Sequence, residues 1–179
     1  MNVFKLNEDP TVAAMLQNDK HVVKMATEYA QLLSTAHRVL DGEMYVDRTA
    51  NNRRIKRWRM ADDVMESTLY KASHINHPSN IWTRETDANY RWLHTLWIET
   101  CNEYTFRYGK EHGAYTKLHA LVADLPANIP EGNLTVLPQA MPDDVKGDDA
   151  VLAYQKYYRQ YKAHFSKWTN RATPDFMNA

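Results

Sequence analysis

The sequence predicts an all-α protein: a single compact helical domain of about five to six helices with one long proline-containing loop. Glycine and proline are scarce, at 5 and 7 of 179 residues, while helix-forming residues such as Ala, Leu, Met and Glu are frequent. Several stretches repeat apolar residues every three or four positions, which is the period of an amphipathic helix. The length suits one domain with a sizeable core, so we expect residues 1–179 to fold as one unit.

Composition narrows the class of protein further. A hydrophobic fraction of 44% and a charged fraction of 25% are ordinary for a soluble globular protein. No apolar run approaches the length of a membrane span and the first residues do not resemble a signal peptide, so we expect no membrane partner. The single cysteine, Cys101, excludes an internal disulfide and suits a cytoplasmic location. A net charge of zero argues against bulk coating of nucleic acid but permits a local basic groove.

The residues from Asp19 to Leu40 predict the helix around which the chain is organised. At 3.6 residues per turn, one broad arc of this helix is apolar: Val22, Met25, Ala26, Tyr29, Leu32, Leu33, Ala36 and Leu40. Beside it runs a polar row of His21, Lys24, Glu28, Gln31 and Thr35. A base, an amine, a carboxylate and an amide in one row predict a functional face. The alternative is that Lys24 and Glu28 form an ordinary surface ion pair.

The ends of this helix and the segment before it carry clear signals. Residues 1–8 read as a short extended segment. Asp9 is a good helix cap, and a short helix is expected over about residues 10–17. Asn18 then caps the central helix, and Gly42 is expected to end it in the left-handed conformation.

Residues 43–60 are predicted to form an irregular basic loop. Six cations lie within a dozen positions, with Trp58 among them: Arg48, Arg53, Arg54, Lys56, Arg57 and Arg59. Such a segment is either a solvated connector or a loop that contacts phosphates and stacks an aromatic ring on a base.

Two histidines follow a helix expected over about residues 62–72. Pro78 forces His77 out of helical geometry and is expected to stop any helix there. His74 and His77 are therefore placed on a loop between helices, where functional side chains concentrate. No cysteine or carboxylate nearby completes a zinc site, so the sequence predicts no metal and favours a core or capping role for one histidine.

The second half of the chain predicts three more helices. A long helix over about residues 84–110 has an inward stripe of Tyr90, Leu93, Trp97, Thr100, Cys101, Tyr104 and Tyr108, and a further helix covers 111–124. Residues 125–147 hold four of the seven prolines and read as an irregular loop. The last helix, over about 148–167, carries many aromatic residues, and residues 169–179 read as a tail.

Three segments resemble the pyrimidine dimer DNA glycosylases of the endonuclease V (ultraviolet repair) family, which are small all-helical enzymes. Asp19-Lys20-His21 followed by Glu28 matches a frame in which the glutamate seven residues after the histidine is catalytic. The pattern Tyr70…His77-Pro78…Trp82 resembles a segment of bacterial relatives. Tyr154-Gln-Lys-Tyr-Tyr158 resembles the family's aromatic carboxyl end. The resemblance covers about residues 15–37, 70–93 and 154–168.

The chain also departs from that family. Those enzymes attack C1′ of the nucleotide with the amine of a small residue that removal of the initiator Met exposes, whereas Asn2 is large enough to block this removal. The two arginines that flank the family's glutamate correspond here to Thr27 and Gln31. The attacking amine is therefore expected to be the amino terminus or, as an alternative, Lys24 one turn from Glu28.

We therefore predict an enzyme that acts on nucleic-acid bases without a cofactor, in its leading form a DNA glycosylase with or without lyase activity. Its predicted catalytic residues are Glu28, Lys24 and His21, the last to orient substrate or shuttle protons. The predicted substrate-binding residues are Gln31, Arg53, Arg54, Arg57, Trp58, His77, Trp82, Asn89 and Tyr158. Two alternatives remain open. One is an enzyme acting on free nucleotides or modified bases with the same site, and the other is a non-catalytic viral-type accessory or inhibitor protein that binds a partner protein.

Overall fold

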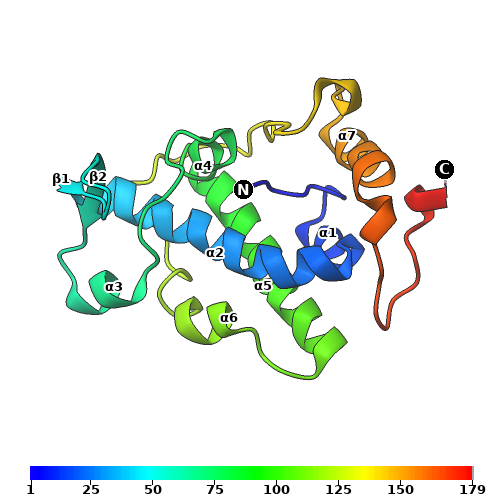
Figure 1. The fold of residues 1–179 in the computed structure, drawn as a ribbon, viewed down its shortest axis with the longest axis horizontal. Helices are drawn as coiled ribbons and strands as arrows, with labels where there is room; N and C mark the ends of the chain where they lie inside the picture. The colour runs from blue at the N-terminus through cyan, green and yellow to red at the C-terminus, as the bar shows by residue number, and fades with distance from the viewer. Residues whose placement is uncertain (179) are drawn as a thin grey trace.

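Helix α2 (Asp19–Asp41) forms the centre of the protein (Figure 1). The computed structural model describes residues 1–178, and within them the chain forms seven α-helices and one small two-stranded sheet. The Asn18 side chain caps α2 by accepting a hydrogen bond from the His21 amide. Its predicted apolar arc is buried from Val22 to Ala36. The predicted all-α fold class is therefore confirmed.

Two further helices complete the core against α2. Helix α5 (Asp87–Tyr108) crosses α2, and α1 (Pro10–Leu16) packs against α5 (Figure 1). The contact face of α5 carries the fully buried Tyr90, Leu93, Leu96 and Trp97. Trp97 donates its indole N–H to the Ala26 carbonyl of α2 at 2.9 Å, so the largest core side chain also leaves no polar atom unpaired.

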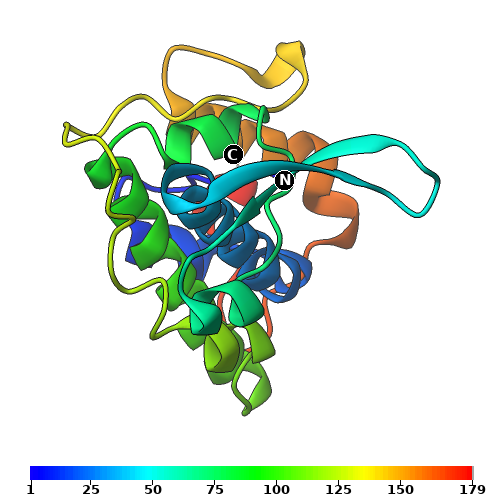
Figure 2. The same ribbon diagram turned by 90° about the vertical axis from the view of Figure 1, so that its left-hand side faces the viewer.

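Residues 43–60 differ from the predicted irregular loop. They form an antiparallel hairpin of β1 (Glu43–Arg48) and β2 (Arg54–Arg59), which projects away from the helices in Figure 2. All of β1 is exposed, so no apolar and polar alternation marks the strand in the sequence. Asn52 takes a positive φ of 59° in the connecting turn, a conformation that asparagine tolerates well.

Gly42, between α2 and β1, has a different role from the expected one. Its φ is −89°, so it does not end α2 in the left-handed conformation. A Cβ atom at this position would lie 2.5 Å from the Arg38 carbonyl oxygen and 3.1 Å from that of Arg59. Glycine is needed here because helix and hairpin backbones approach each other closely.

Helices α3 (Asp63–Thr68), α6 (Gly113–Leu118) and α7 (Ala150–Tyr157) are shorter than predicted. Helix α4 (Pro78–Thr83) was not predicted. Pro78 begins α4 rather than stopping a helix, because proline is well tolerated at the first helical position. Helix α5 ends at Gly109, whose φ is 69°. The predicted irregular loop over residues 125–147 contains no α-helix or strand, but it includes one 3-10 turn, η1 (Asp143–Val145). Helix α7 continues into a π-helical turn, η2 (Tyr158–Lys162).

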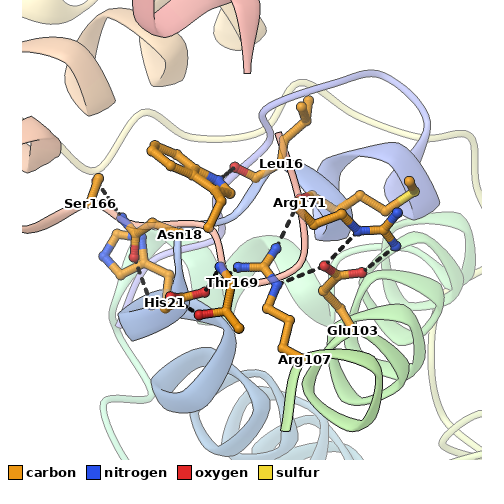
Figure 3. A network of polar contacts seen from close by, with 11 residues as sticks. Leu16, Asn18, His21, Glu103, Arg107, Ser166, Thr169 and Arg171 are labelled. Atoms are coloured by element: carbon orange, nitrogen blue, oxygen red, sulfur yellow. Dashed lines mark hydrogen bonds and ion pairs between the residues drawn. The ribbon is translucent and has the colours of Figure 1, made fainter. Parts of the chain in front are cut away.

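A buried ion-pair network joins α2, α5 and the segment after residue 167 (Figure 3). Arg107 of α5 contacts Asp19 at 2.9 Å and Glu103 at 2.7 Å, and its side chain has no exposed surface. Arg171 contacts the second oxygen of Glu103 at 2.8 Å, and the Thr169 amide donates to Asp19 at 2.9 Å. The predicted tail is therefore tied to the core at Thr169 and Arg171.

None of the helices within residues 1–178 is both long enough and apolar enough to cross a membrane.

Candidate active site at Glu28

Glu28 lies between two amino groups on the solvent side of α2. The α-amino nitrogen of Met1 is 3.7 Å from one carboxylate oxygen, and Nζ of Lys24 is 3.1 Å from the other. The Met1 side chain is 4% exposed and the Glu28 side chain 17%, whereas the Lys24 side chain is 65% exposed. The carboxylate is therefore half-buried, and it lies between the α-amine of a residue whose side chain is buried and a lysine amine at the surface.

The extended first residues place the α-amine beside Glu28. The Asn2 amide donates to the Ala140 carbonyl at 2.9 Å, and its oxygen accepts a hydrogen bond from the Tyr154 hydroxyl at 2.7 Å. The Phe4 amide donates to the Tyr29 hydroxyl at 3.2 Å, and the side chains of Val3 and Leu6 are fully buried. Contacts with residues far along the chain thus anchor the segment that directly follows the amine.

His77 belongs to the same cluster. Its Nδ1 accepts a hydrogen bond from the Ser79 amide at 3.2 Å, which caps α4, so the expectation of a capping histidine is confirmed. Burial, the positive Met1 amine and His74 lower the pKa of His77, while the Glu28 carboxylate raises it. The pKa of His77 therefore responds to the charges of both the amine and the carboxylate.

The loop that carries the two histidines is strained and firmly held. His74 has a φ of 49°, a conformation that costs a residue with a Cβ atom about 1 kcal/mol or more. The buried Asn80 side chain donates to the Ser73 carbonyl at 2.8 Å, and Arg84 donates to the Ile75 carbonyl at 2.7 Å. Such strain persists where the surroundings over-determine it, as at functional sites.

His21 is not placed to act on a substrate, although its helical position is close to that of Glu28. Its ring is buried, stacks on Phe4 with centroids 4.2 Å apart, and shares a short hydrogen bond with the Tyr158 hydroxyl. Burial, together with the positive Lys162 and Lys24, lowers the pKa of His21 to about 3. The predicted roles of His21 in proton transfer and of Tyr158 in substrate binding are therefore corrected, because both side chains belong to the core.

Because His21 is buried in its neutral form, the free energy of unfolding should decrease in acid. The unfolded His21 binds a proton near pH 6.5 and the folded one does not until about pH 3, so the folded state loses stability as pH falls below 6.5. Between pH 7 and pH 5 this one group should cost about 2 kcal/mol. Urea unfolding of His21→Gln should accordingly show a weaker loss between these two pH values than the parent protein. An equal loss in both proteins would contradict the assignment.

Trp82 and Asn89 also have structural roles. Trp82 is 3% exposed and donates its indole N–H to the Thr135 carbonyl at 3.3 Å. The Asn89 side chain is fully buried and bonds the Trp82 carbonyl at 2.9 Å and the Thr135 hydroxyl at 2.8 Å. They attach the irregular loop to α4 and α5, so the prediction that they bind substrate is corrected.

The structure separates the remaining predicted residues into two groups. Gln31 lies one turn beyond Glu28 on α2 and is half-buried, so it stays with the site. Arg53, Arg54, Arg57 and Trp58 are on the hairpin, whose base at Gly42 is about 20 Å from Glu28 at 1.5 Å per residue along α2. Arg57 also pairs with Asp47 at 3.6 Å. The base of the hairpin is therefore separated from the cluster around Glu28 by about four turns of α2.

Within residues 1–178, no three His, Cys, Asp or Glu side chains are grouped to hold a metal ion. Comparisons with protein-family models, with curated proteins and with solved structures find no match for this chain. An amine beside a half-buried carboxylate can attack an electrophilic carbon while the carboxylate accepts and returns the proton.

The buried arginine that holds the hairpin was not predicted from the sequence. Arg38 of α2 is 3% exposed and donates to the carbonyls of Trp58 and Tyr70 at 2.9 Å and to Glu66 at 2.6 Å. Arg38 stands among apolar residues in the sequence, and this position could have indicated a buried arginine. Arg38 fixes the base of the hairpin to the central helix.

Proposed function

We propose that this protein is a DNA glycosylase that works through a covalent imine, with Glu28 as its catalytic carboxylate and an adjacent amine as its nucleophile. The supporting observation is the Met1 amine at 3.7 Å from the half-buried Glu28 carboxylate, on a chain end whose side chain is only 4% exposed. The same pairing of amine and glutamate is what the resemblance to the pyrimidine dimer glycosylases implies.

The reaction uses Glu28 as a proton relay. The amine lone pair attacks C1′ of the target nucleotide, and the glycosidic C1′–N bond breaks with its electron pair leaving on the base, which takes up a proton. The attacking nitrogen gives a proton to the Glu28 carboxylate, which passes it to the ring oxygen as the sugar opens to an imine. Water hydrolyses the imine and restores the amine. If C2′ first loses a proton, the C3′–O bond breaks and the strand is cut.

Of the two amines, the Met1 α-amine is better suited to the attack. Backbone and side-chain contacts of Asn2 and Phe4 restrain it, whereas Lys24 ends a flexible and mostly exposed side chain. A nucleophile held in place loses less entropy on reaching the transition state. We therefore assign the attack to Met1 and retain Lys24 as the alternative.

Borohydride trapping tests both the chemistry and the amine. Ultraviolet-irradiated duplex and abasic duplex should each give a covalent protein–DNA band with the parent protein, and peptide mapping of the adduct should identify residue 1. Lys24→Ala should retain the band, since Met1 and Glu28 remain in place. Loss of the band in Lys24→Ala, with the adduct mapped to Lys24 in the parent, would reassign the nucleophile. No band on either duplex, with base release from free nucleosides, would contradict a DNA glycosylase.

A further inference from the structure

The β1–β2 hairpin has two chemically different faces. In its register Met44 pairs with Trp58, Val46 with Lys56 and Arg48 with Arg54, and directly opposed residues project to the same side of an antiparallel pair. We call this side the basic face: Met44, Val46, Arg48, Arg54, Lys56 and Trp58. The opposite side is the paired face: Glu43, Tyr45, Asp47, Ile55, Arg57 and Arg59.

Charge is concentrated on the basic face. It carries three cations and no carboxylate, while the paired face carries two cations and two carboxylates. On the paired face Arg57 contacts Asp47 at 3.6 Å, and the Arg59 guanidinium lies 5.0 Å from the Tyr45 ring centre. A chain with zero net charge thus presents a strip of net charge +3 on one side of a projecting ribbon.

The ribbon also projects, and it is attached rigidly. Figure 2 shows it extending clear of the helices, and all of β1 is exposed. Val46, in the middle of the basic face, is 50% exposed. At the base of the hairpin the buried Arg38 donates a hydrogen bond to the Trp58 carbonyl, so the ribbon has a fixed direction relative to α2. Exposed cations interleaved with apolar side chains on a rigid ribbon are suited to a polyanion with a shaped surface.

We propose that the basic face of the β1–β2 hairpin binds in a groove of double-stranded DNA, and this rests on the proposed glycosylase function. A major groove about 12 Å wide admits a two-stranded ribbon, and cations along it can neutralise phosphates on either side. Strands of six residues span about 20 Å, long enough to follow the groove for several base pairs.

The distance from the hairpin to Glu28 is short enough for one DNA duplex to contact both. Gly42, at the base of the hairpin, lies 14 residues after Glu28 on the continuous α2, or about 20 Å away. At 3.4 Å per base pair this corresponds to about six base pairs. A duplex that lies along α2 can therefore engage the hairpin while its target nucleotide reaches Glu28. A free nucleotide cannot reach both.

The test compares two double variants of the full chain with equal loss of charge. Arg54→Gln with Lys56→Gln removes two cations of the basic face, and Arg57→Gln with Arg59→Gln removes two of the paired face. Fluorescence anisotropy would measure affinity for an undamaged 20-base-pair duplex and for the corresponding single strand at several salt concentrations. Thermal unfolding would verify that both variants fold.

We expect the parent protein to prefer the duplex over the single strand. The basic-face variant should lose at least about tenfold in duplex affinity, and the slope of log affinity against log salt should become shallower by about 1.8, the value for two lost phosphate contacts. The paired-face variant should change the slope by less than half of that. Equal effects of the two variants, or a preference for the single strand, would overturn the hairpin proposal.

The borohydride experiment on the parent protein separates the two proposals. Trapping on abasic duplex together with equal effects of the two double variants would leave the glycosylase standing and reject the hairpin as its DNA contact. Duplex binding through the basic face without any trapping on damaged DNA would support the hairpin and reject imine chemistry.

Discussion

Glu28→Gln should lower the rate of base excision and strand cleavage by at least about 100-fold, because an amide cannot relay the proton from the attacking amine to the sugar. Gln has the same shape, and Glu28 is partly exposed, so the fold should remain intact. Single-turnover cleavage of ultraviolet-irradiated duplex would measure the rate, and anisotropy would verify that DNA affinity is retained.

Glu8→Gln is the matched control for this experiment. Glu8 is on the same extended segment as the Met1 amine and pairs with Lys5 at 2.7 Å. Its side chain is 72% exposed, and it lies outside the cluster around Glu28. Its replacement should leave the cleavage rate within about twofold, as expected for an exposed ion pair with no role in the reaction. Full cleavage activity in Glu28→Gln would show that the carboxylate has no catalytic role.

Arg107→Met should cost about 3–5 kcal/mol of unfolding free energy, which is the usual consequence of removing one partner from a buried ion pair. The substitution keeps most of the alkyl volume but leaves Glu103, which is 3% exposed, with Arg171 as its remaining cation. It also removes the guanidinium from Asp19 at the start of α2. Denaturant unfolding would measure the loss, with the slope of the transition showing whether unfolding stays two-state.

Arg91→Met provides the comparison on the same helix. Arg91 and Asp87 form an ion pair with the same four-residue spacing as Arg107 and Glu103, but at 3.7 Å and with the arginine 65% exposed. Solvent screening should keep the cost of this substitution below about 1 kcal/mol. Similar losses for Arg91→Met and Arg107→Met would show that burial does not make the Arg107 network important for stability.

The sequence alone could predict the parts of the site that lie within one helix. Lys24 and Glu28 are one turn apart, so their contact follows from helical geometry once the apolar arc and the Asn18 cap identify α2. The same local reasoning failed at His21, which shares the helical row with Glu28. Phe4 covers His21, and that contact depends on where the first residues pack.

The hairpin shows a different limit of sequence reasoning. Its cations were visible in the sequence, but β1 is exposed on both faces and therefore has no hydrophobic period to mark it as a strand. Its pairing also decides which cations act together, since Arg57 pairs with Asp47 whereas Arg54 and Lys56 share the basic face. The number of cations in the segment alone could not show which of them are paired with carboxylates and which share the basic face.

The sequence by itself determined the helical class, the central helix and the adjacent Lys24 and Glu28, because caps and a 3.6-residue period act over a few neighbouring positions. The tertiary structure alone decided that the Met1 amine lies beside Glu28. That contact spans 27 positions and depends on Asn2 bonding Ala140 and Tyr154, which are more than 130 positions away. Such long-range contacts form only when the whole core assembles, so no local pattern in the sequence encodes them.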